Sequence, residues 1–183
     1  MAEESKTVYQ ELLAKRIVFL RTPIDCIVAS DVIAQLLYLD GVNSKDKISL
    51  YINSPGGIIT DGLAIYDVIQ SIKSPVSTLC MGQAMSMAAI LLTAGSKGER
   101  YALKHSKMML HQPGVYTIGG KASEVEITAE QLIADSNRLE AIIASHTGQT
   151  KERVHQDCEK TFYMTAQEAK AYGLIDEILT KLP

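Results

Sequence analysis

The sequence predicts an α/β fold in which crossover helices connect the strands of a mostly parallel sheet. Strand-like and helix-like segments alternate along most of the chain, which is the order that parallel sheets require. Hydrophobic residues make up 46% of the 183 residues and charged residues 21%, a composition that supports a substantial core. The sequence contains no internal repeat and no Pro/Ser-rich linker, so we expect a single domain over residues 1–183.

The first half of the chain predicts a leading helix over Val8–Lys15 and then strands that alternate with helices. The expected strands are RIVFL, KISLYINS and PVSTLCMG. The segment PIDCIVASDVIAQLLYLDG has the spacing of an amphipathic helix, with apolar residues at Val28, Val32, Ile33, Leu36 and Leu37. A further helix is expected from Ile58 to Lys73, with one apolar side formed by Ile58, Ile59, Ile65, Tyr66, Ile69 and Ile72.

The second half predicts a buried helix, two short strands and one long helix. SMAAILLTAG is almost wholly apolar, so we expect this helix to be covered on all sides. YALKHSKMMLHQP predicts two short strands that end near His111. The long helix runs from about Glu124 to Ser145 with a narrow apolar seam at Val125, Ala129, Leu132, Ser136, Leu139 and Ile143. Such a seam can pack on the core of its own domain. Because two of its residues, Ala129 and Ser136, are small, it can instead pack closely against a second subunit.

Charge and residue usage exclude several classes of function. The net charge is -3 and no basic block occurs, so we expect neither nucleic acid nor a membrane as partner. No apolar run approaches the ~20 residues that cross a bilayer, and the polar start MAEESKTVYQELLAKR is unlike a secretory signal. Three widely spaced cysteines favour a reducing, cytoplasmic location. The four histidines form no HxxxH pair and there is no CxxC, so no metal site is expected.

One hydroxyl stands out in MGQAMSMAAILL. A strand, a glycine, Ser86 and a helix start follow one another, which is the order that displays a nucleophile on a sharp turn. The helix start leaves backbone N–H groups without partners, and that of Met87 is placed to stabilise an oxyanion. The alternative is that Ser86 is a buried capping serine.

Two further segments contain candidate site residues. In YINSPGG, Gly57 lets the backbone approach a ligand and offers its N–H as a second oxyanion donor, although a simple strand-to-helix turn also explains the glycines. In MMLHQPG, His111 ends a strand and is either a general base or a structural histidine.

Taken together, INSPGG, GQAMSM and MMLHQP, in this order and at these separations, resemble the proteolytic subunit of the Clp protease. The resemblance continues over nearly the whole chain, in the strings LLAKRI, AQLLYL, LAIYD, AGSKGERYAL, SHTGQ and MTAQEAKAYGLIDEI. It implies the Clp protease/crotonase-like fold with a protruding handle helix, at about residues 112–146, and an ATP-dependent serine endopeptidase that cleaves unfolded polypeptides.

The resemblance also implies roles for individual residues and for partners. Ser86 matches the nucleophile, His111 the general base, and Gly57 and Met87 the oxyanion hole. The segment GVYTIGG matches a strand that binds extended substrate by β-augmentation. The handle matches the contact between two stacked heptameric rings. A hexameric AAA+ unfoldase would use the ATP, and the chain itself would need no cofactor.

The chain departs from the family pattern at several positions. Alignment on SHTGQ and MTAQEA places Thr161 where the family has the third triad residue, an aspartate, and Asp157 and Glu159 lie nearby. The segment before LLAKRI lacks the apolar Ile-Pro residues that form axial pore loops, and Ser49 replaces a tyrosine of the ATPase-docking pocket. These departures indicate a divergent paralogue.

Three functions remain open at this stage. The first is an active endopeptidase that uses Ser86 and His111. The second is a weakly active or structural subunit of a mixed particle that depends on a full-triad paralogue. The third, an acyl-CoA enzyme of the crotonase fold, ranks far lower because that chemistry does not need a Ser–His pair.

Overall fold

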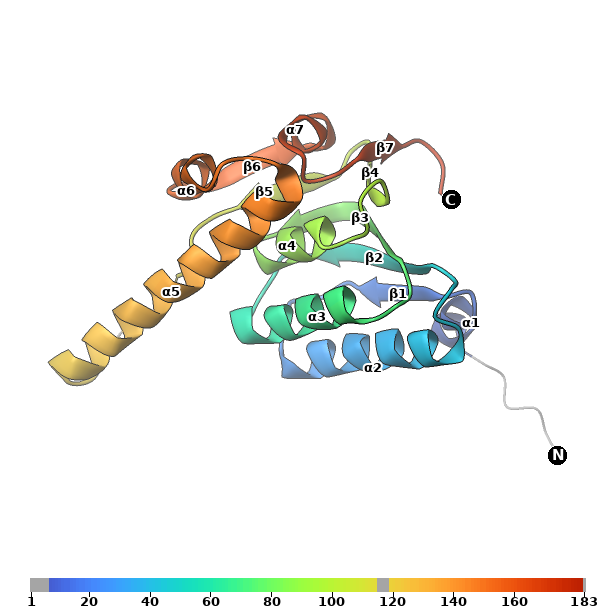
Figure 1. Cartoon of the computed structure of the whole chain (residues 1–183), viewed down its shortest axis with the longest axis horizontal. Coiled ribbons are helices and arrows are strands. Elements are labelled where there is room, and N and C mark those ends of the chain that lie inside the picture. The colour runs from blue at the N-terminus through green and yellow to red at the C-terminus, as the bar shows by residue number, and fades with distance from the viewer. Residues whose placement is uncertain (1–6, 115–118, 183) are drawn as a thin grey trace.

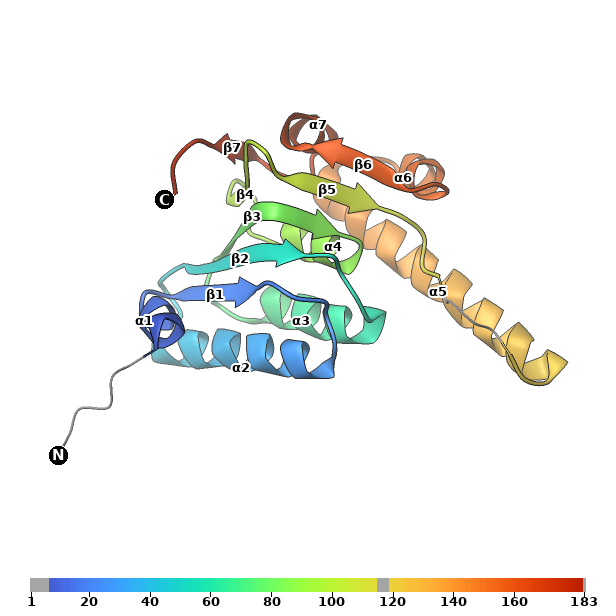
Figure 2. The ribbon, with the colours of Figure 1, turned by 180° about the vertical axis from the view of Figure 1, so that it is seen from behind.

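The computed structural model describes residues 7–114 and 119–182, and its strands form one sheet. The strands are β1 (Ile17–Leu20), β2 (Ile48–Ser54), β3 (Val76–Met85), β4 (Arg100–Leu103), β5 (Lys107–Leu110), β6 (Phe162–Thr165) and β7 (Glu177–Leu179). Their order is β1-β2-β3-β4-β7, and β5 pairs with both β3 and β6. Every pairing is parallel except β5 with β6 (Figure 2). The predicted α/β fold with a mostly parallel sheet is confirmed.

Helices connect the strands and cover the sheet. They are α1 (Val8–Ala14), α2 (Cys26–Val42), α3 (Ile59–Ser71), α4 (Met87–Thr93), α5 (Ala122–Thr147), α6 (Lys151–Cys158) and α7 (Ala166–Tyr172). Helices α2 and α3 lie side by side, while α5 starts far from the sheet and returns to it at its C-terminal end (Figure 1). The two short strands predicted around His111 do not form a hairpin; both β4 and β5 pair with β3, at different points along its length.

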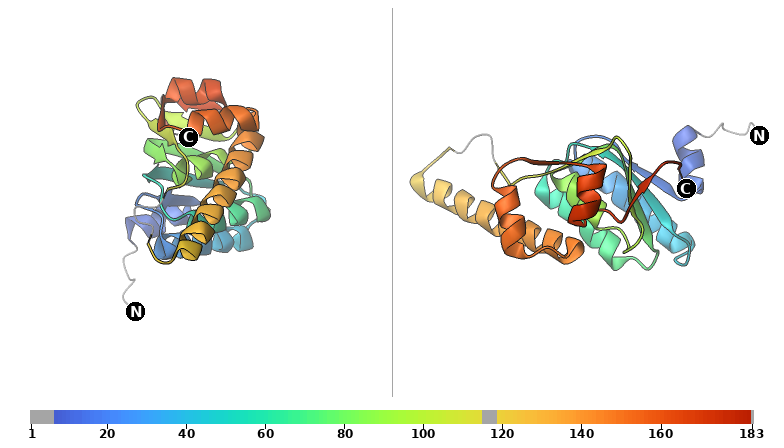
Figure 3. Two further views of the ribbon diagram at one scale, coloured as in Figure 1. Left: turned by 90° about the vertical axis from the view of Figure 1, so that its left-hand side faces the viewer. Right: turned by 90° about the horizontal axis from the view of Figure 1, so that it is seen from above.

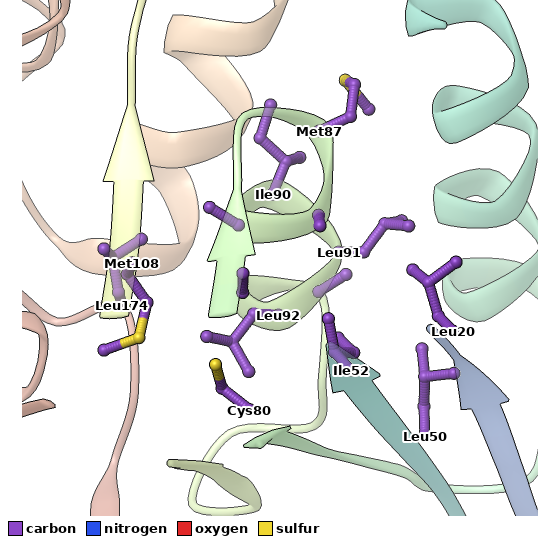
Figure 4. Close-up of a cluster of buried hydrophobic side chains, with 14 of the residues drawn as sticks. Leu20, Leu50, Ile52, Cys80, Met87, Ile90, Leu91, Leu92, Met108 and Leu174 are labelled. Atoms are coloured by element: carbon purple, nitrogen blue, oxygen red, sulfur yellow. The ribbon is translucent and has the colours of Figure 1, made fainter. Parts of the chain in front are cut away.

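Helix α4 lies at the centre of the core. All seven of its residues are buried, as the uninterrupted apolar sequence predicts. Its side chains pack with those of the central strands, among them Leu50 and Ile52 of β2 (Figure 4). Each fully buried side chain of this size contributes about 1.5–3 kcal/mol. The position of α4, and therefore of the turn before it, is fixed by this packing.

Two details of the predicted helices are wrong. Leu37 was expected on the buried stripe of α2 but is 52% exposed, because the buried stripe follows Ala29, Val32, Leu36 and Leu39. Successive residues of a helix point about 100° apart, so Leu36 and Leu37 cannot both face the core. Ile58 was expected inside the next helix, but α3 begins at Ile59 and Ile58 is 53% exposed at the position before it.

The apolar seam of α5 divides into two parts. Leu139 and Ile143 are buried in the core of the chain itself. The N-terminal half of the helix extends away from the sheet (Figure 3), and there Val125 and Ala129 are exposed. The seam therefore packs on its own domain only near the C-terminal end of the helix. Four residues of GVYTIGG, 115–118, lie outside the described residues, so the expected substrate strand stays a prediction.

Candidate active site

Ser86 occupies a strained turn between β3 and α4. Its φ of 54° and ψ of -127° are unusual for a non-glycine residue, and such conformations cost about 1–3 kcal/mol. Its amide N–H donates to the carbonyl oxygen of Met109 on β5 over 2.8 Å, which holds the turn against the neighbouring strand. Within the described residues the Ser86 side chain makes no capping hydrogen bond to α4. The alternative of a capping serine is therefore wrong.

The Ser86 hydroxyl instead contacts His111. Ser86 Oγ and His111 Nε2 are 2.9 Å apart, within the range of a hydrogen bond. His111 directly follows β5 and is exposed, so solvent and substrate can reach the pair. When the hydroxyl donates to Nε2, the imidazole proton is on Nδ1. This arrangement suits removal of the hydroxyl proton by the imidazole.

The two expected oxyanion donors lie on adjacent segments. A Cβ built on Gly56 would lie 2.8 Å from Ser86 Cβ and 3.0 Å from the nitrogen of Met87, so the glycine loop packs directly on the turn that contains Ser86. Next to it, Gly57 forms a bridge with Ile24, and a side chain on Gly57 would overlap the Ile24 backbone.

The backbone N–H groups on these segments are available to a ligand. The hydrogen bonds of the bridge use the Gly56 carbonyl and the N–H of Ile58, so in the described structure the N–H of Gly57 has no partner. The N–H of Met87, in the first turn of α4, likewise has none among the described residues. Two such donors beside a nucleophile can stabilise the oxyanion of an acyl-transfer intermediate.

Thr161 lies next to His111 at the end of the β5–β6 ladder. Leu110 pairs with Phe162 in antiparallel register, so the next two residues outward are His111 and Thr161. Thr161 is exposed, and the described residues include no hydrogen bond between its side chain and His111. Asp157, the nearby acid, is bound to Arg153 instead, with Oδ2 2.7 Å from Nε. The register therefore puts Thr161 beside His111, and no carboxylate among the described residues is hydrogen-bonded to the imidazole.

The sequence reasoning missed two residues near the site. A Cβ on Gly62 of α3 would lie 2.5 Å from Met87 Cε, so this glycine makes room for the side chain that anchors the start of α4. An isolated glycine in a helical pattern was the available signal. Glu140 of α5 is a buried carboxylate that accepts hydrogen bonds from Ser136 and His155, and nothing local in the sequence marks it.

Among residues 7–114 and 119–182, no three His, Cys, Asp or Glu side chains are grouped so that they can hold a metal ion. No helix in the described part of the chain has both the length and the apolar character needed to span a bilayer.

A family model described as Clp protease matches residues 1–182. The match covers all but the last residue, and the mainly parallel sheet agrees with it. On these grounds the chain belongs to the Clp protease family, a family of peptidases.

Proposed function

We propose that the chain hydrolyses peptide bonds with Ser86 as nucleophile and His111 as general base. The 2.9 Å distance between Ser86 Oγ and His111 Nε2 is the observation that carries the proposal, since proton transfer requires this reach. Membership of the Clp protease family supports it, because the family consists of proteolytic subunits.

The geometry supports a two-step acyl transfer. His111 Nε2 takes the hydroxyl proton while Ser86 Oγ bonds to the substrate carbonyl carbon, and the N–H groups of Gly57 and Met87 donate to the resulting oxyanion. His111 then gives the proton to the leaving amine, the C–N bond breaks, and an ester remains on Ser86. Water attacks this ester with the same proton transfers, which releases the carboxylic acid and restores Ser86.

We propose Thr161 as the residue at the third position of the triad, with a weaker role than an acid. A hydroxyl can accept a hydrogen bond from Nδ1 of His111, but it brings no negative charge to stabilise the imidazolium. Loss of the acid from a serine triad lowers turnover about 10⁴-fold. We therefore expect the isolated chain to be a slow peptidase.

Hydrolysis of a fluorogenic peptide tests these roles. Ser86→Ala and His111→Ala should both lower the rate to background, whereas Ser44→Ala, in the turn between α2 and β2, should retain the wild-type rate. A Ser86→Ala variant as fast as the wild type would contradict the proposal.

We further propose that the chain works in two stacked heptameric rings that a hexameric AAA+ unfoldase supplies with unfolded polypeptide at the expense of ATP. The exposed positions Val125 and Ile127 on the projecting half of α5 support a contact between subunits there. Sedimentation should give a particle far heavier than the 20.0 kDa chain, and Val125→Glu should dissociate it. A wild-type monomer at micromolar concentration would overturn this part.

The three cysteines are all thiols in the described structure, which fits a reducing location such as the cytoplasm.

The second candidate function is a weakly active subunit of a mixed particle, and the absent carboxylate beside His111 favours it. Labelling with a fluorophosphonate, alone and after mixing with a full-triad family member, separates the two. If Ser86 is labelled only in the mixture, the chain depends on its partner; equal labelling in both samples supports an autonomous peptidase.

A further inference from the structure

A hollow of about 190 Å³ lies next to the segment that follows His111. It is lined by Gln112 and Pro113, the two residues after His111, and by residues from the middle of α5, among them Leu132 and Ser136. The N–H of Gln112 donates to the carbonyl oxygen of Cys158 over 3.0 Å, which fixes this segment to the end of α6. The hollow is several times larger than the about 30 Å³ that a water molecule occupies in the liquid, so it can accept an amino-acid side chain.

The hollow contains a buried carboxylate. Glu140 is the one acidic residue and His155 the one basic residue among the described residues that line it, and the Glu140 side chain is only 5% exposed. Oε1 accepts hydrogen bonds from Ser136 Oγ and His155 Nδ1, both over 2.9 Å. Oε2 accepts none from the described residues.

The second carboxylate oxygen of Glu140, Oε2, is not fully buried. The Tyr172 hydroxyl is the only side-chain polar atom, among those described, that is both fully buried and without a partner. Glu140 Oε2 is therefore not fully buried, and Glu140 is one of the residues that line the hollow.

We propose that this hollow binds a side chain of the peptide substrate and that Glu140 Oε2 selects a cationic one, lysine or arginine. The inference rests on the proposed peptidase function, because it assigns a substrate preference to that same site. Pro113 and Leu132 offer apolar surface to the methylene stem of such a side chain, while the carboxylate binds its charged end.

Glu140 suits this role because its other interactions leave its second oxygen unused. The bonds from Ser136 and His155 hold the carboxylate in one orientation, so little ordering is needed when a substrate binds. If a substrate offers no hydrogen-bond donor, the buried polar group of the site is left unpaired when that substrate binds. Such a substrate is therefore disfavoured. A norleucine side chain fills similar space without a donor and should therefore be a poorer substrate.

Two series of fluorogenic peptides test the proposal on the assembled wild-type particle. In one series the residue before the cleaved bond is Lys, norleucine or Glu; in the other, the residue after it varies in the same way. In one of the two series kcat/KM should favour Lys over norleucine at least about tenfold, the effect expected of a hydrogen bond to a charged group. The Glu peptide should be the slowest.

Variants at Glu140 separate selectivity from positioning. Glu140→Gln should reduce the Lys-to-norleucine ratio toward one while leaving the norleucine rate within about threefold of the wild type. Glu140→Asp keeps the charge and should retain part of the preference for Lys over norleucine. It replaces Glu140→Gln in the test if that variant does not fold. Glu130→Gln, at an exposed position on the projecting half of α5, should keep the wild-type ratio.

The outcomes distinguish the two proposals. Cleavage of all peptides without a preference for Lys in either series would overturn the subsite and leave the peptidase intact. An equal loss for every peptide in Glu140→Gln would also overturn it, because Glu140 would then only support the fold. If no peptide is cleaved and Ser86 is not labelled by a fluorophosphonate, the peptidase function itself fails, and the subsite with it.

Discussion

The amide nitrogen of Ser86 lies 2.8 Å from the carbonyl oxygen of Met109, only two residues before His111. This hydrogen bond continues the parallel pairing of β3 with β5 beyond Met85. The residue that displays the hydroxyl and the strand that ends in the imidazole are therefore held together by backbone, so their side chains meet at 2.9 Å without support from a third residue. The sheet, rather than a flexible loop, sets the geometry of the pair.

Gly56→Ala should damage the site specifically. A Cβ there would lie 2.5 Å from the Met85 carbonyl oxygen and 2.8 Å from Ser86 Cβ, so the nucleophile turn must shift. Gly98→Ala is the matched control, because Gly98 has a similar φ (85° against 89°) with no atom within 4 Å of the new Cβ. Gly98→Ala should lose about 1 kcal/mol from backbone strain, measured by urea unfolding, and Gly56→Ala should lose more because its Cβ also meets backbone atoms. Only Gly56→Ala should also lose fluorophosphonate labelling, and equal labelling of the two would show that the close approach is unimportant.

Thr161→Asp should raise peptide turnover. The antiparallel register puts position 161 next to His111, and a carboxylate there can accept a hydrogen bond from Nδ1 and stabilise the imidazolium. We expect kcat to rise at least about tenfold with little change in KM, a part of the about 10⁴-fold effect of the acid in serine triads. Glu159→Asp, two positions earlier on an exposed site, should not change kcat. An unchanged kcat in Thr161→Asp would mean that the missing acid does not limit the reaction.

The pair formed by His155 and Glu140 should make stability depend on pH. The pKa of His155 is raised above its ordinary value of 6.5. The larger cause is the hydrogen bond between His155 and Glu140, and the second is the negative charge of the Glu140 carboxylate. The pair therefore stabilises the fold fully below that ordinary value, and the contribution is lost as the pH rises through the raised pKa. The Tm advantage of wild type over His155→Gln should be larger at about pH 5.5 than at about pH 8.5. A difference that does not vary between these two conditions would contradict the assigned ion pair.

Asp176→Asn should be strongly destabilising. Asp176 Oδ1 lies 2.6 Å from Arg100 Nη2, while Oδ2 accepts from Arg100 Nε and from two backbone N–H groups. Burial alone would raise the pKa of Asp176, but these hydrogen bonds outweigh it and the pKa is lowered. Since the Arg100 side chain is only 8% exposed, the variant leaves a buried charge unpaired.

The expected loss for Asp176→Asn is about 3 kcal/mol, measured by urea unfolding. Glu99→Gln breaks the exposed pair with Lys47, and this control should cost less than about 1 kcal/mol. Similar costs for the two variants would show that the burial of Arg100 does not matter.

The sequence alone predicts which residues of a helix are buried where the hydrophobic pattern allows only one arrangement. The seven residues of α4 are almost all apolar, so the helix had to be buried. Ser86 alone forms the turn before it, because β3 continues past Gly82 to Met85. In α2, by contrast, four consecutive apolar residues occupy positions 36–39, and only packing against the sheet decides that Leu36 and Leu39 face inward.

Other features depend on residues far apart in the sequence. The partner of Glu140 is His155, on the following helix, so neither residue alone marks this pair. The contact between Ser86 and His111 requires β3 to pair with β4 first and then with β5, and alternating strand and helix patterns do not specify that switch. The family resemblance supplied what local patterns did not; the register of β5 with β6 puts Thr161 next to His111, while its role as the third triad residue stays a prediction.

The central claim is that Ser86 is a nucleophile activated by His111, and covalent labelling tests it most directly. The purified particle is incubated with a fluorophosphonate, and the modified residue is located by peptide mass mapping. We expect one phosphonyl adduct on Ser86, formed with loss of fluoride, none in Ser86→Ala, and much slower labelling in His111→Ala. A wild-type chain that stays unlabelled, alone and when mixed with a full-triad family member, would contradict the account.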